Sequence, residues 1–524
     1  MQEATTNEPQ GEDPVDDLKV LITAGEAYPE LERAFLNAQK EITAGFHIFD
    51  LTTRLRSSAA RETGETWFDL FLATVNRGVS IRVVVADFDP VCAPALHRTA
   101  WQAKRQIMAV REVAKARAGR LDCVVALHSA HTGSVPRVLC YPFVRYRLRK
   151  LARYWRKLDP AQRKGVMSEA PRLKPVCYED EQGRLRLPPR LVDLYPATHH
   201  QKIAVFDRRK VYVGGLDLNE RRFDTKRHRR PAEATWHDVQ LMATGPVAQA
   251  AQHHLESFLD TVDGASPPAP ARGFLRTISR RRKSAPVRMA PKPVVREIED
   301  RHERAIGQAR QLVYLETQFL RHVPLARALA RRARERPGLR LIVVLPAAPE
   351  QVAFATSRAL DAQYGEYQQM RCLSVLKGAF GQDRMVVASP VQPRRRQSDG
   401  RAALKAAPII YVHSKVSIFD GSGAIVSSAN LNGRSLRWDT ECGLYLNDRD
   451  HVEQLRERVM GHWLPEDAGE EYLDPARAFD AWRKLVENNT ASPPHQRQGL
   501  LVRYNSDAAQ DVAAAAPGVP EEMV

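Results

Sequence analysis

The chain has 524 residues, of which 43% are hydrophobic and 27% are charged, and this composition excludes an intrinsically disordered protein. Its formal net charge of +17 favours polyanionic partners such as nucleic acid, anionic lipid headgroups or phosphate-bearing substrates, without choosing among them. The length allows two or three domains, each large enough for a core of its own.

The six cysteines are scattered and include no C-x-x-C pair, which predicts free thiols in a reducing compartment rather than a zinc site or a disulfide framework. The N-terminal stretch is acidic and polar, so we expect no secretory signal and a cytoplasmic location. Export by a route that needs no signal peptide stays open. No run is long enough for a transmembrane helix, so any action on lipid is expected from the membrane surface.

The first half of the chain is expected to span residues 17–263, after a disordered tail over 1–16. A helical pattern runs into an apolar run over 31–53, and a second apolar run follows at 80–88. A basic insert is predicted at about 104–190. Such alternation of helical and β-branched segments predicts a sheet covered by helices.

Within that insert, residues 141–158 carry seven positive charges and no negative ones. Val144, Leu148, Leu151, Tyr154 and Trp155 recur there at near-helical spacing. One interpretation is a basic amphipathic helix that lies on a membrane surface. The other is a helix that packs this stripe on its own domain and leaves the charges in water. The spacing alone does not separate the two.

A basic, proline-rich segment over 264–295 reads as an exposed linker, and a second half is predicted at 296–463. This half again has a helix and then a strand over 296–320, followed by an apolar run at 339–347. Residues 464–524 are expected to form a C-terminal extension and a flexible tail. The predicted fold is α/β: two similar α-β-α-β-α halves, each a mixed sheet flanked by helices, with the active site in the cleft between them.

Each half contains the pattern H-x-K-x-x-x-x-D: His200, Lys202 and Asp207 in the first, and 213 positions later the same three residue types in the second. Alternate residues of a strand share a face, so each histidine and its lysine point the same way. The apolar runs on both sides of each aspartate predict a hairpin. Because aspartate favours tight turns, we expect Asp207 and its counterpart Asp420 to be structural rather than directly catalytic.

Two such hairpins supply what phosphodiester cleavage requires. One histidine attacks phosphorus while the other protonates the leaving oxygen, and two lysines neutralise the phosphate oxygens. The second pair is His413 and Lys415. This chemistry needs no cofactor, and we expect no metal centre at the site.

With Gly214 and Gly215 after the first motif and "SSAN" after the second, the pattern resembles the phospholipase D superfamily. The stretches "YVGGLDLNERRFD", "TWHDVQLMATGPV", "YLETQF" and "SANLNGRS" resemble its lipid-acting and cardiolipin synthase-like members, in order. The resemblance covers most of residues 30–463. It leaves out the insert, the linker and the last 60 residues.

This resemblance implies a role for each matching position. His200 would form a phosphohistidine and His413 would act as general acid and base, with Asp238 and Glu441 behind the two histidines. The phosphate would be bound by Lys202, Lys415, Asn430 and Asp217, where Asp217 stands in a slot that holds asparagine in simpler members. Ser428 belongs to the motif, and Ser427 replaces its usual glycine. Glu316 and Gln318 share a strand face and are expected either to line the cleft or to be ordinary polar residues at a strand end.

The resemblance implies a phosphodiesterase that hydrolyses the headgroup ester of a glycerophospholipid, or transfers the phosphatidyl group to an alcohol. We expect a monomer that visits membranes, with anionic lipid as a partner. The alternative is a nuclease or another nucleic-acid phosphodiesterase of the same superfamily, which the net charge also favours. A non-catalytic phosphate-binding protein ranks last, because both motifs are intact.

Overall fold

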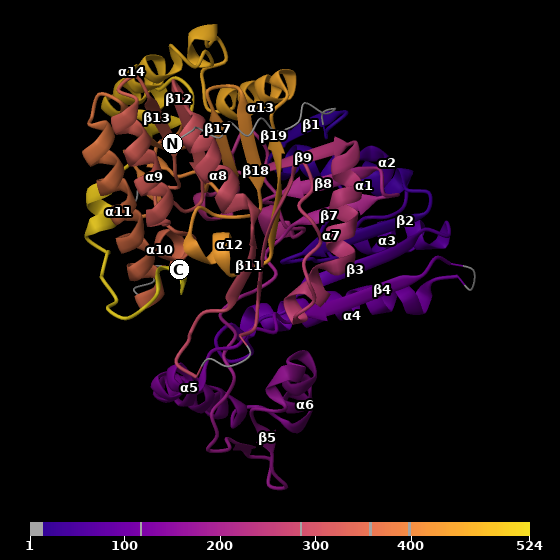
Figure 1. Ribbon diagram of the computed structural model, residues 1–524. Helices are drawn as coiled ribbons and strands as arrows, with labels where there is room; N and C mark the ends of the chain where they lie inside the picture. Colours follow the sequence, from indigo (N-terminus) through magenta and orange to yellow (C-terminus); the bar gives the residue numbers. More distant parts are fainter. Residues whose placement is uncertain (1–13, 116–117, 283–285, 356–358, 397–399, 524) are drawn as a thin grey trace.

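The computed structural model describes residues 14–115, 118–282, 286–355, 359–396 and 400–523. Two mixed sheets lie side by side in one body, and a smaller lobe projects from it (Figure 1). The α/β class and the two sheets flanked by helices agree with the fold predicted from the sequence.

The first sheet has seven strands in the order β1-β9-β8-β7-β2-β3-β4. Their bounds are β1 Leu18–Ile22, β2 Glu41–Phe46, β3 Ser80–Ala86, β4 Leu121–Ala126, β7 Ile203–Phe206, β8 Lys210–Gly214 and β9 Val239–Thr244. The register of β2, β3 and β4 is parallel, and β1, β9, β8 and β7 are joined to their neighbours antiparallel.

The second sheet has nine strands in the order β11-β10-β19-β18-β17-β12-β13-β14-β20. Their bounds are β10 Phe274–Arg280, β11 Lys292–Arg296, β12 Leu312–Thr317, β13 Arg340–Val344, β14 Met385–Pro390, β17 Lys415–Phe419, β18 Gly423–Ser427, β19 Glu441–Leu446 and β20 Leu501–Arg503. Seven of these strands, from β10 to β14 in the sheet order, repeat the order and the strand directions of the first sheet. The two halves are therefore similar in topology as well as in sequence pattern.

Helices cover the outer faces of both sheets and also fill the space between the sheets. The first-half helices are α1 Thr23–Asn37, α2 Ser58–Arg61, α3 Trp67–Asn76, α4 Pro94–Val113, α5 Ser134–Trp155, α6 Pro160–Glu169 and α7 Pro246–Asp263. The second-half helices are α8 Glu297–Gln308, α9 Val323–Glu335, α10 Glu350–Ala355, α11 Leu360–Phe380, α12 Gly433–Arg437, α13 Arg449–Gly461, α14 Ala478–Ala491 and α15 Ser506–Gln510.

The hydrophobic core is continuous between the halves. One cluster of buried side chains contains strands of both sheets together with α7, α13 and α14. Separate clusters lie under α1, α3 and α4 on the outer face of the first sheet and under α8, α9 and α11 on the outer face of the second. The shared cluster holds the two halves in a fixed relation, and this relation positions the site described below.

The linker predicted over 264–295 is wrong in part. Residues Phe274–Arg280 form the buried strand β10, and Lys292–Arg296 pair with it as β11. The segment reads as a linker because its charges and prolines lie around the strand, while the apolar residues of β10 are few and are separated by arginine. Residues 283–285 of this segment lie outside the described residues.

The predicted insert begins too early. Residues 104–113 belong to α4, whose Ala103, Ile107 and Val110 are buried on the first sheet, and β4 follows as that sheet's edge strand. The projecting lobe consists of residues 134–193, with α5, α6 and the two-stranded ribbon of β5 (Tyr178–Glu179) and β6 (Leu185–Arg186). We call residues 134–193 the projecting lobe.

The predicted tails are only partly as expected. Residues 1–13 and 524 lie outside the described residues, whereas Val15 is buried and the Asp16 amide donates to the Thr244 carbonyl. At the other end, β20 joins the second sheet, and Glu522 pairs with Arg437. The C-terminal extension is therefore part of the second half rather than a flexible tail.

All six cysteines are free, as the sequence predicts. Among the described residues, no helix has both the length and the apolar character that crossing a bilayer requires.

Candidate active site

Each motif is carried by a tight hairpin in the middle of its sheet. The β7–β8 turn places Asp207 and Arg208 at positive φ, and the β17–β18 turn does the same with Asp420 and Gly421. Both central residues at positive φ are typical of the primed turns that match the twist of paired strands. Strand β7 begins three residues after His200, and β17 begins two residues after His413.

The motif aspartates fasten these hairpins to the rest of the sheet. The carboxylate of Asp207 accepts hydrogen bonds from the amides of residues 39–41, at 2.8–2.9 Å, and Asp420 accepts from those of residues 310–312, at 2.6–2.8 Å. In both halves the donors lie between the first helix and the first central strand. The two aspartates are thus placed at turns, away from the histidines.

Two short backbone bridges connect the halves next to the motifs. His199 pairs with Thr440, with the His200 amide 2.9 Å from the Thr440 carbonyl. His237 pairs with Val412, with the His413 amide 2.8 Å from the His237 carbonyl. Each bridge sets a motif histidine from one half beside the residue that precedes a carboxylate in the other half.

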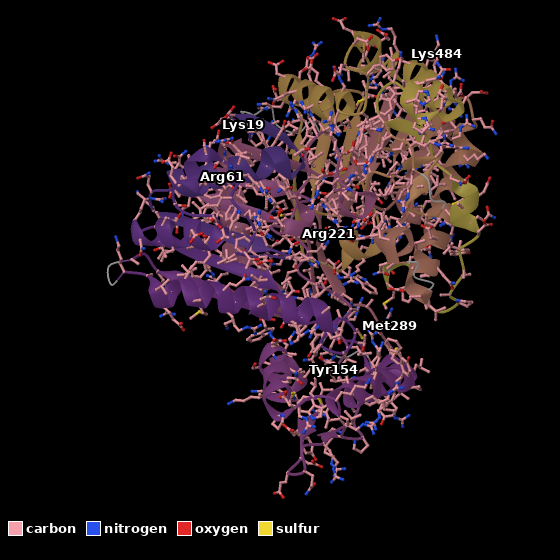
Figure 2. The ribbon with its side chains drawn as sticks, turned by 180° about the vertical axis from the view of Figure 1, so that it is seen from behind. Lys19, Arg61, Tyr154, Arg221, Met289 and Lys484 are labelled. Atoms are coloured by element: carbon pink, nitrogen blue, oxygen red, sulfur yellow. The ribbon has the colours of Figure 1, made fainter. Side chains whose placement is uncertain are left out.

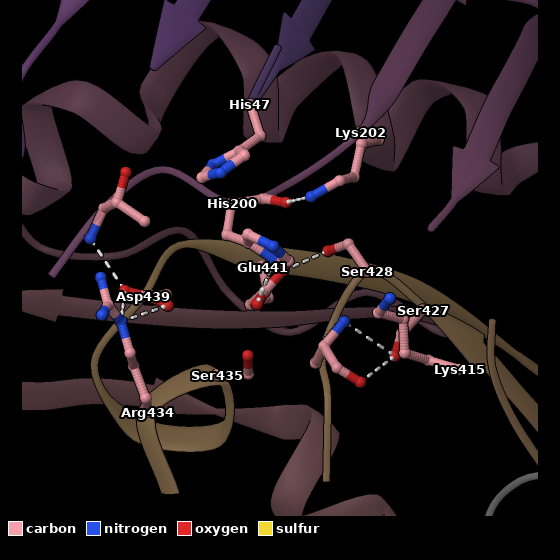
Figure 3. Close-up of polar contacts among 12 residues, drawn as sticks. His47, His200, Lys202, Lys415, Ser427, Ser428, Arg434, Ser435, Asp439 and Glu441 are labelled. Atoms are coloured by element: carbon pink, nitrogen blue, oxygen red, sulfur yellow. Dashed lines mark hydrogen bonds and ion pairs between the residues drawn. The ribbon is translucent and has the colours of Figure 1, made fainter. Parts of the chain in front are cut away.

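As a result, the halves exchange carboxylates. Nδ1 of His200 lies 2.9 Å from Oε1 of Glu441, and Nδ1 of His413 lies 2.7 Å from Oδ2 of Asp238 (Figure 3 shows the first pair). Hydrogen bonding at Nδ1 orients each ring and leaves its Nε2 for chemistry. Each of the two motif histidines thus pairs with a carboxylate from the other half.

Both carboxylates are fully buried and held from behind. The Ser428 hydroxyl donates to Oε2 of Glu441 at 2.5 Å. A Cβ at Gly215 would lie 2.2 Å from Oδ1 of Asp238, so only glycine allows this approach. Burial raises the pKa of Glu441 to about 7 and that of Asp238 to about 6, while the lysine charges act against this rise.

The two lysines are also buried, and both approach the pair of histidines. Nζ of Lys202 lies 2.5 Å from the His200 carbonyl oxygen and 3.9 Å from Oδ2 of Asp217. Nζ of Lys415 contacts the His413 carbonyl and lies 3.0 Å from Nδ1 of that ring. Asp217 also accepts a hydrogen bond from the Ile48 amide, so its carboxylate suits the orientation of Lys202 better than the binding of an anion.

The two motifs are close enough for their charges to interact. Burial lowers the pKa of both imidazoles well below the usual range, and the charges of both lysines lower it further for each ring. Burial likewise lowers the pKa of Lys415 to about 7. The lowered pKa values favour neutral rings, and a neutral imidazole is the nucleophilic form.

The remaining predicted residues fall into two groups. Asn430 is buried near the motif, and its Oδ1 has no partner in the structure. Glu316 lines no cleft: it is fully buried and accepts from His237, Ser414, Tyr314 and Trp463 at 2.5–2.9 Å. Gln318 donates to the Tyr411 hydroxyl at 2.9 Å. Alternation along the strand correctly set these two residues on one face but could not show that helices cover this face.

Sequence reasoning missed three features around the site. The ring of His47, directly after β2, lies 4.5 Å from the ring of His200. Arg434 pairs with Asp439 at 3.1 Å, and the Asp439 carboxylate accepts from the Thr198 amide at 2.8 Å. The centroid of the Trp236 ring lies 4.5 Å from that of His413, and the guanidinium of Arg222 lies over the indole, 3.7 Å from the ring centroid. His47 stands at the end of a buried strand, a position that could have marked it.

A group of three histidines, none of them a motif residue, could hold a metal ion. His228, His237 and His462 each offer one nitrogen, and these atoms lie within 4.8 Å of one another. Asp224 and Glu316 accept from the first two rings, as carboxylates do behind metal ligands. However, Nε2 of His228 lies 3.1 Å from Nε2 of His462, so one shared proton satisfies this pair without an ion.

The fold and the site define a class: an α/β protein of two similar halves that share one histidine–lysine site. The pairs His200–Glu441 and His413–Asp238 set the site between the halves, and the two histidine side chains are only 14% and 8% exposed.

Comparison with known proteins shows what the chain is similar to. Residues 303–463 match the family model described as "Cardiolipin synthase, PLD-like domain". Phospholipase D alpha 1 of Oryza sativa subsp. japonica is 25% identical over 46% of this chain and 44% of its own length. Phospholipase D alpha 1 of Nicotiana tabacum is 23% identical over the same shares. Together with the two motifs, these matches confirm the resemblance: the second half is similar to a phospholipase D-like domain, and nearly half of the chain is similar to phospholipases D.

The chain spans less than half the length of these curated relatives. Two solved structures have a distant likeness. Phosphatidylserine synthase of Haemophilus influenzae Rd KW20 is 12% identical with a TM-score of 0.49, and the match covers 85% of both chains. Polyphosphate kinase of Porphyromonas gingivalis is 11% identical with a TM-score of 0.42, over 86% of this chain and 48% of the other. Neither likeness is close enough to inform the activity.

Proposed function

We propose that this protein cleaves the headgroup ester of a glycerophospholipid through a phosphohistidine, and passes the phosphatidyl group to water or to an alcohol. The observation that carries the proposal is the exchange of carboxylates: His200 and His413 each depend on the other half and are set at one site with two lysines. The phospholipases D among its relatives and the match to a cardiolipin synthase domain family support a phospholipid substrate.

In the first step, Nε2 of His200 attacks phosphorus, and the bond from phosphorus to the headgroup oxygen breaks. His413, in its protonated form, gives that oxygen its proton, so a neutral headgroup alcohol leaves. In the second step, water or an alcohol attacks the same phosphorus and gives its proton to His413. The phosphorus–nitrogen bond breaks, and His200 regains its lone pair.

The other residues would support these two steps without taking part in bond exchange. Lys202 and Lys415 would neutralise the non-bridging oxygens, and the Asn430 amide group would donate to one of them. Glu441 and Asp238 would stabilise the positive charge that each ring acquires during its step. A bound phosphodiester anion would also offset the lysine charges that hold the pKa of His413 low, and so favour the protonated acid.

A substrate with an activated leaving group separates the two histidines. In phosphatidyl-p-nitrophenol the leaving group, nitrophenolate, departs without protonation. With this substrate we expect His413→Asn to release one equivalent of nitrophenol and then stop. His200→Asn should release none, and mass spectrometry after a neutral denaturing quench should find the phosphatidyl adduct only in His413→Asn. A burst from His200→Asn would contradict the assignment of the nucleophile.

Product analysis on mixed phospholipid vesicles tests the substrate. Free headgroup with phosphatidic acid indicates hydrolysis, and a new phosphatidyl alcohol in the presence of ethanol or glycerol indicates transfer. Cleaved DNA without any lipid turnover would favour the alternative of a nuclease, which the net charge of +17 keeps open. Binding to nucleic acid would also weaken steeply with salt.

A further inference from the structure

The projecting lobe stands out for what it leaves exposed. The large hydrophobic side chains that are exposed among the described residues number eleven, and six of them lie on the single helix α5. These six are Val135, Val138, Leu139, Phe143, Tyr146 and Tyr154. Leu139 is 76% exposed and Phe143 is 52% exposed. An apolar patch of this kind on a solvent-exposed surface marks an interaction site.

Helix α5 already has a packed face, so this exposure is not an incomplete core. Val144, Leu148 and Trp155 are buried in the two small clusters that hold the lobe together. Val135, Leu139, Phe143 and Tyr146 recur three or four residues apart, so they form a second stripe on another side of the same helix. The structure thus answers the question left open by the spacing: one face packs on the lobe, and a different apolar face meets the solvent.

Positive charge lies at both ends of the apolar stripe. Toward the helix C-terminus the stripe continues with Arg149, Lys150 and Arg153, all exposed, and α5 contains no acidic residue. At the other end, the Val135 amide donates to the Pro286 carbonyl, and a pocket beside it is lined by basic residues. These basic residues are Arg280, Arg281, Arg282, Arg288 and Lys292.

The lobe is fastened to the edge of the first sheet that carries the active site. Arg172 of the lobe contacts Asp87 at 2.6 Å, and directly after the lobe the Tyr195 amide donates to Asp89 at 3.1 Å. Between these two aspartates, the Phe88 ring lies 4.8 Å from that of His47, which in turn neighbours the ring of His200. The lobe is therefore attached on the side of the first half where His200 lies. Figure 2 shows Tyr154 on the lobe and Met289 where the lobe meets the body.

We propose that the exposed stripe of α5 docks the enzyme on an anionic phospholipid bilayer, with the apolar residues 135–146 in the acyl boundary and the flanking cations against the headgroups. Apolar side chains between cations fit such a surface. A nucleic acid offers phosphates for the cations but little for exposed leucine and valine. A second copy of the chain would bring two cationic faces together. The inference deepens the proposed function and rests on it, since docking would bring the enzyme to its phospholipid substrate.

Vesicle sedimentation of the full chain tests the docking surface without any turnover. With phosphatidylglycerol–phosphatidylcholine vesicles, we expect Leu139→Ser with Phe143→Ser to weaken partitioning about tenfold or more. Replacing Arg149, Lys150 and Arg153 by glutamine should weaken it about a hundredfold on anionic vesicles, with little change on pure phosphatidylcholine.

Matched controls come from the second half. Leu360→Ser changes an equally exposed leucine, 79% exposed on α11. Replacing Arg327, Arg331 and Arg334 by glutamine removes three exposed charges from one face of α9. Both controls should bind vesicles like the unaltered chain. All variants should turn over a monomeric short-chain phospholipid at the unaltered rate, because none of these residues lies at the site.

The outcomes separate the two proposals. Equal binding by the lobe variants and the unaltered chain, or equal losses in lobe and control variants, would overturn the docking surface even if lipid turnover is found. Loss of vesicle binding by the lobe variants alone supports docking even if no lipid is cleaved. If the unaltered chain binds a DNA duplex but no vesicles, and the lobe variants lose the duplex, the face belongs to nucleic acid instead.

Discussion

At the scale of single residues, the site is built at a cost in stability. Burial raises the pKa of Glu441 from its usual 4.5 to about 7, so the folded protein binds more protons than the unfolded chain between these two values. The contribution of this group to stability therefore falls as pH rises through that window and is constant above it. Glu441→Gln removes the titration, and the carboxylate that His200 needs is lost with it.

We therefore expect Glu441→Gln to gain stability relative to the unaltered protein as pH rises from 5 to 8, by on the order of 2–3 kcal/mol. Urea unfolding at several pH values measures this difference. Parallel curves for the two proteins would mean that the buried carboxyl does not titrate in this range.

The exchanged carboxylates also predict a kinetic signature. Asp238→Asn and Glu441→Gln should each lower kcat by about two to four orders of magnitude, since the rings lose their orientation and their counter-charge. KM should change little, because neither carboxylate touches the phosphate. Glu256, which pairs with Arg208 on the surface, is a control whose change to glutamine should leave both constants unaltered. A rise in KM at constant kcat would assign the carboxylates to substrate binding.

At the scale of elements, the hairpins predict that stability and catalysis separate. Asp207→Ala and Asp420→Ala each remove a charged acceptor of three backbone amides. Each should destabilise the protein by about 2–4 kcal/mol. Activity per folded molecule should be retained at low temperature. Denaturant midpoints together with kcat measure both quantities. A loss of kcat in a stable variant would instead make the aspartate part of the catalytic machinery.

The same elements show what the sequence could and could not predict. Apolar runs beside H-x-K-x-x-x-x-D were enough for both hairpins and for the repeated α/β order, because strand alternation and turn residues are local signals. The pairing of His200 with Glu441 is not local: it depends on backbone bridges between residues about 240 positions apart. Strand β10 was missed for a related reason, since its burial comes from neighbours β19 and α7 rather than from its own composition.

At the scale of the whole molecule, the cores predict two levels of stability. One cluster unites both sheets with α7, α13 and α14, so the two halves should unfold together in one transition, with equal calorimetric and van't Hoff enthalpies. Two separate transitions for the halves would contradict a shared core.

The described part of the projecting lobe has two small clusters of five buried side chains each, the first of which includes Val91 and Leu194 from outside the lobe, and the lobe carries many arginines and lysines. Local opening should therefore be easiest there. We expect brief trypsin treatment to cut first within residues 145–193 while the body stays intact on a denaturing gel and by mass spectrometry. The nicked protein should keep its turnover of a monomeric substrate, since the histidines and their carboxylates all lie in the body. It should lose its binding to anionic vesicles, because the cut releases the ordered stripe of α5. First cleavage in the body would mean that the lobe is not the least stable part of the molecule. Nicked protein that binds vesicles unchanged would mean that the lobe is not the docking part.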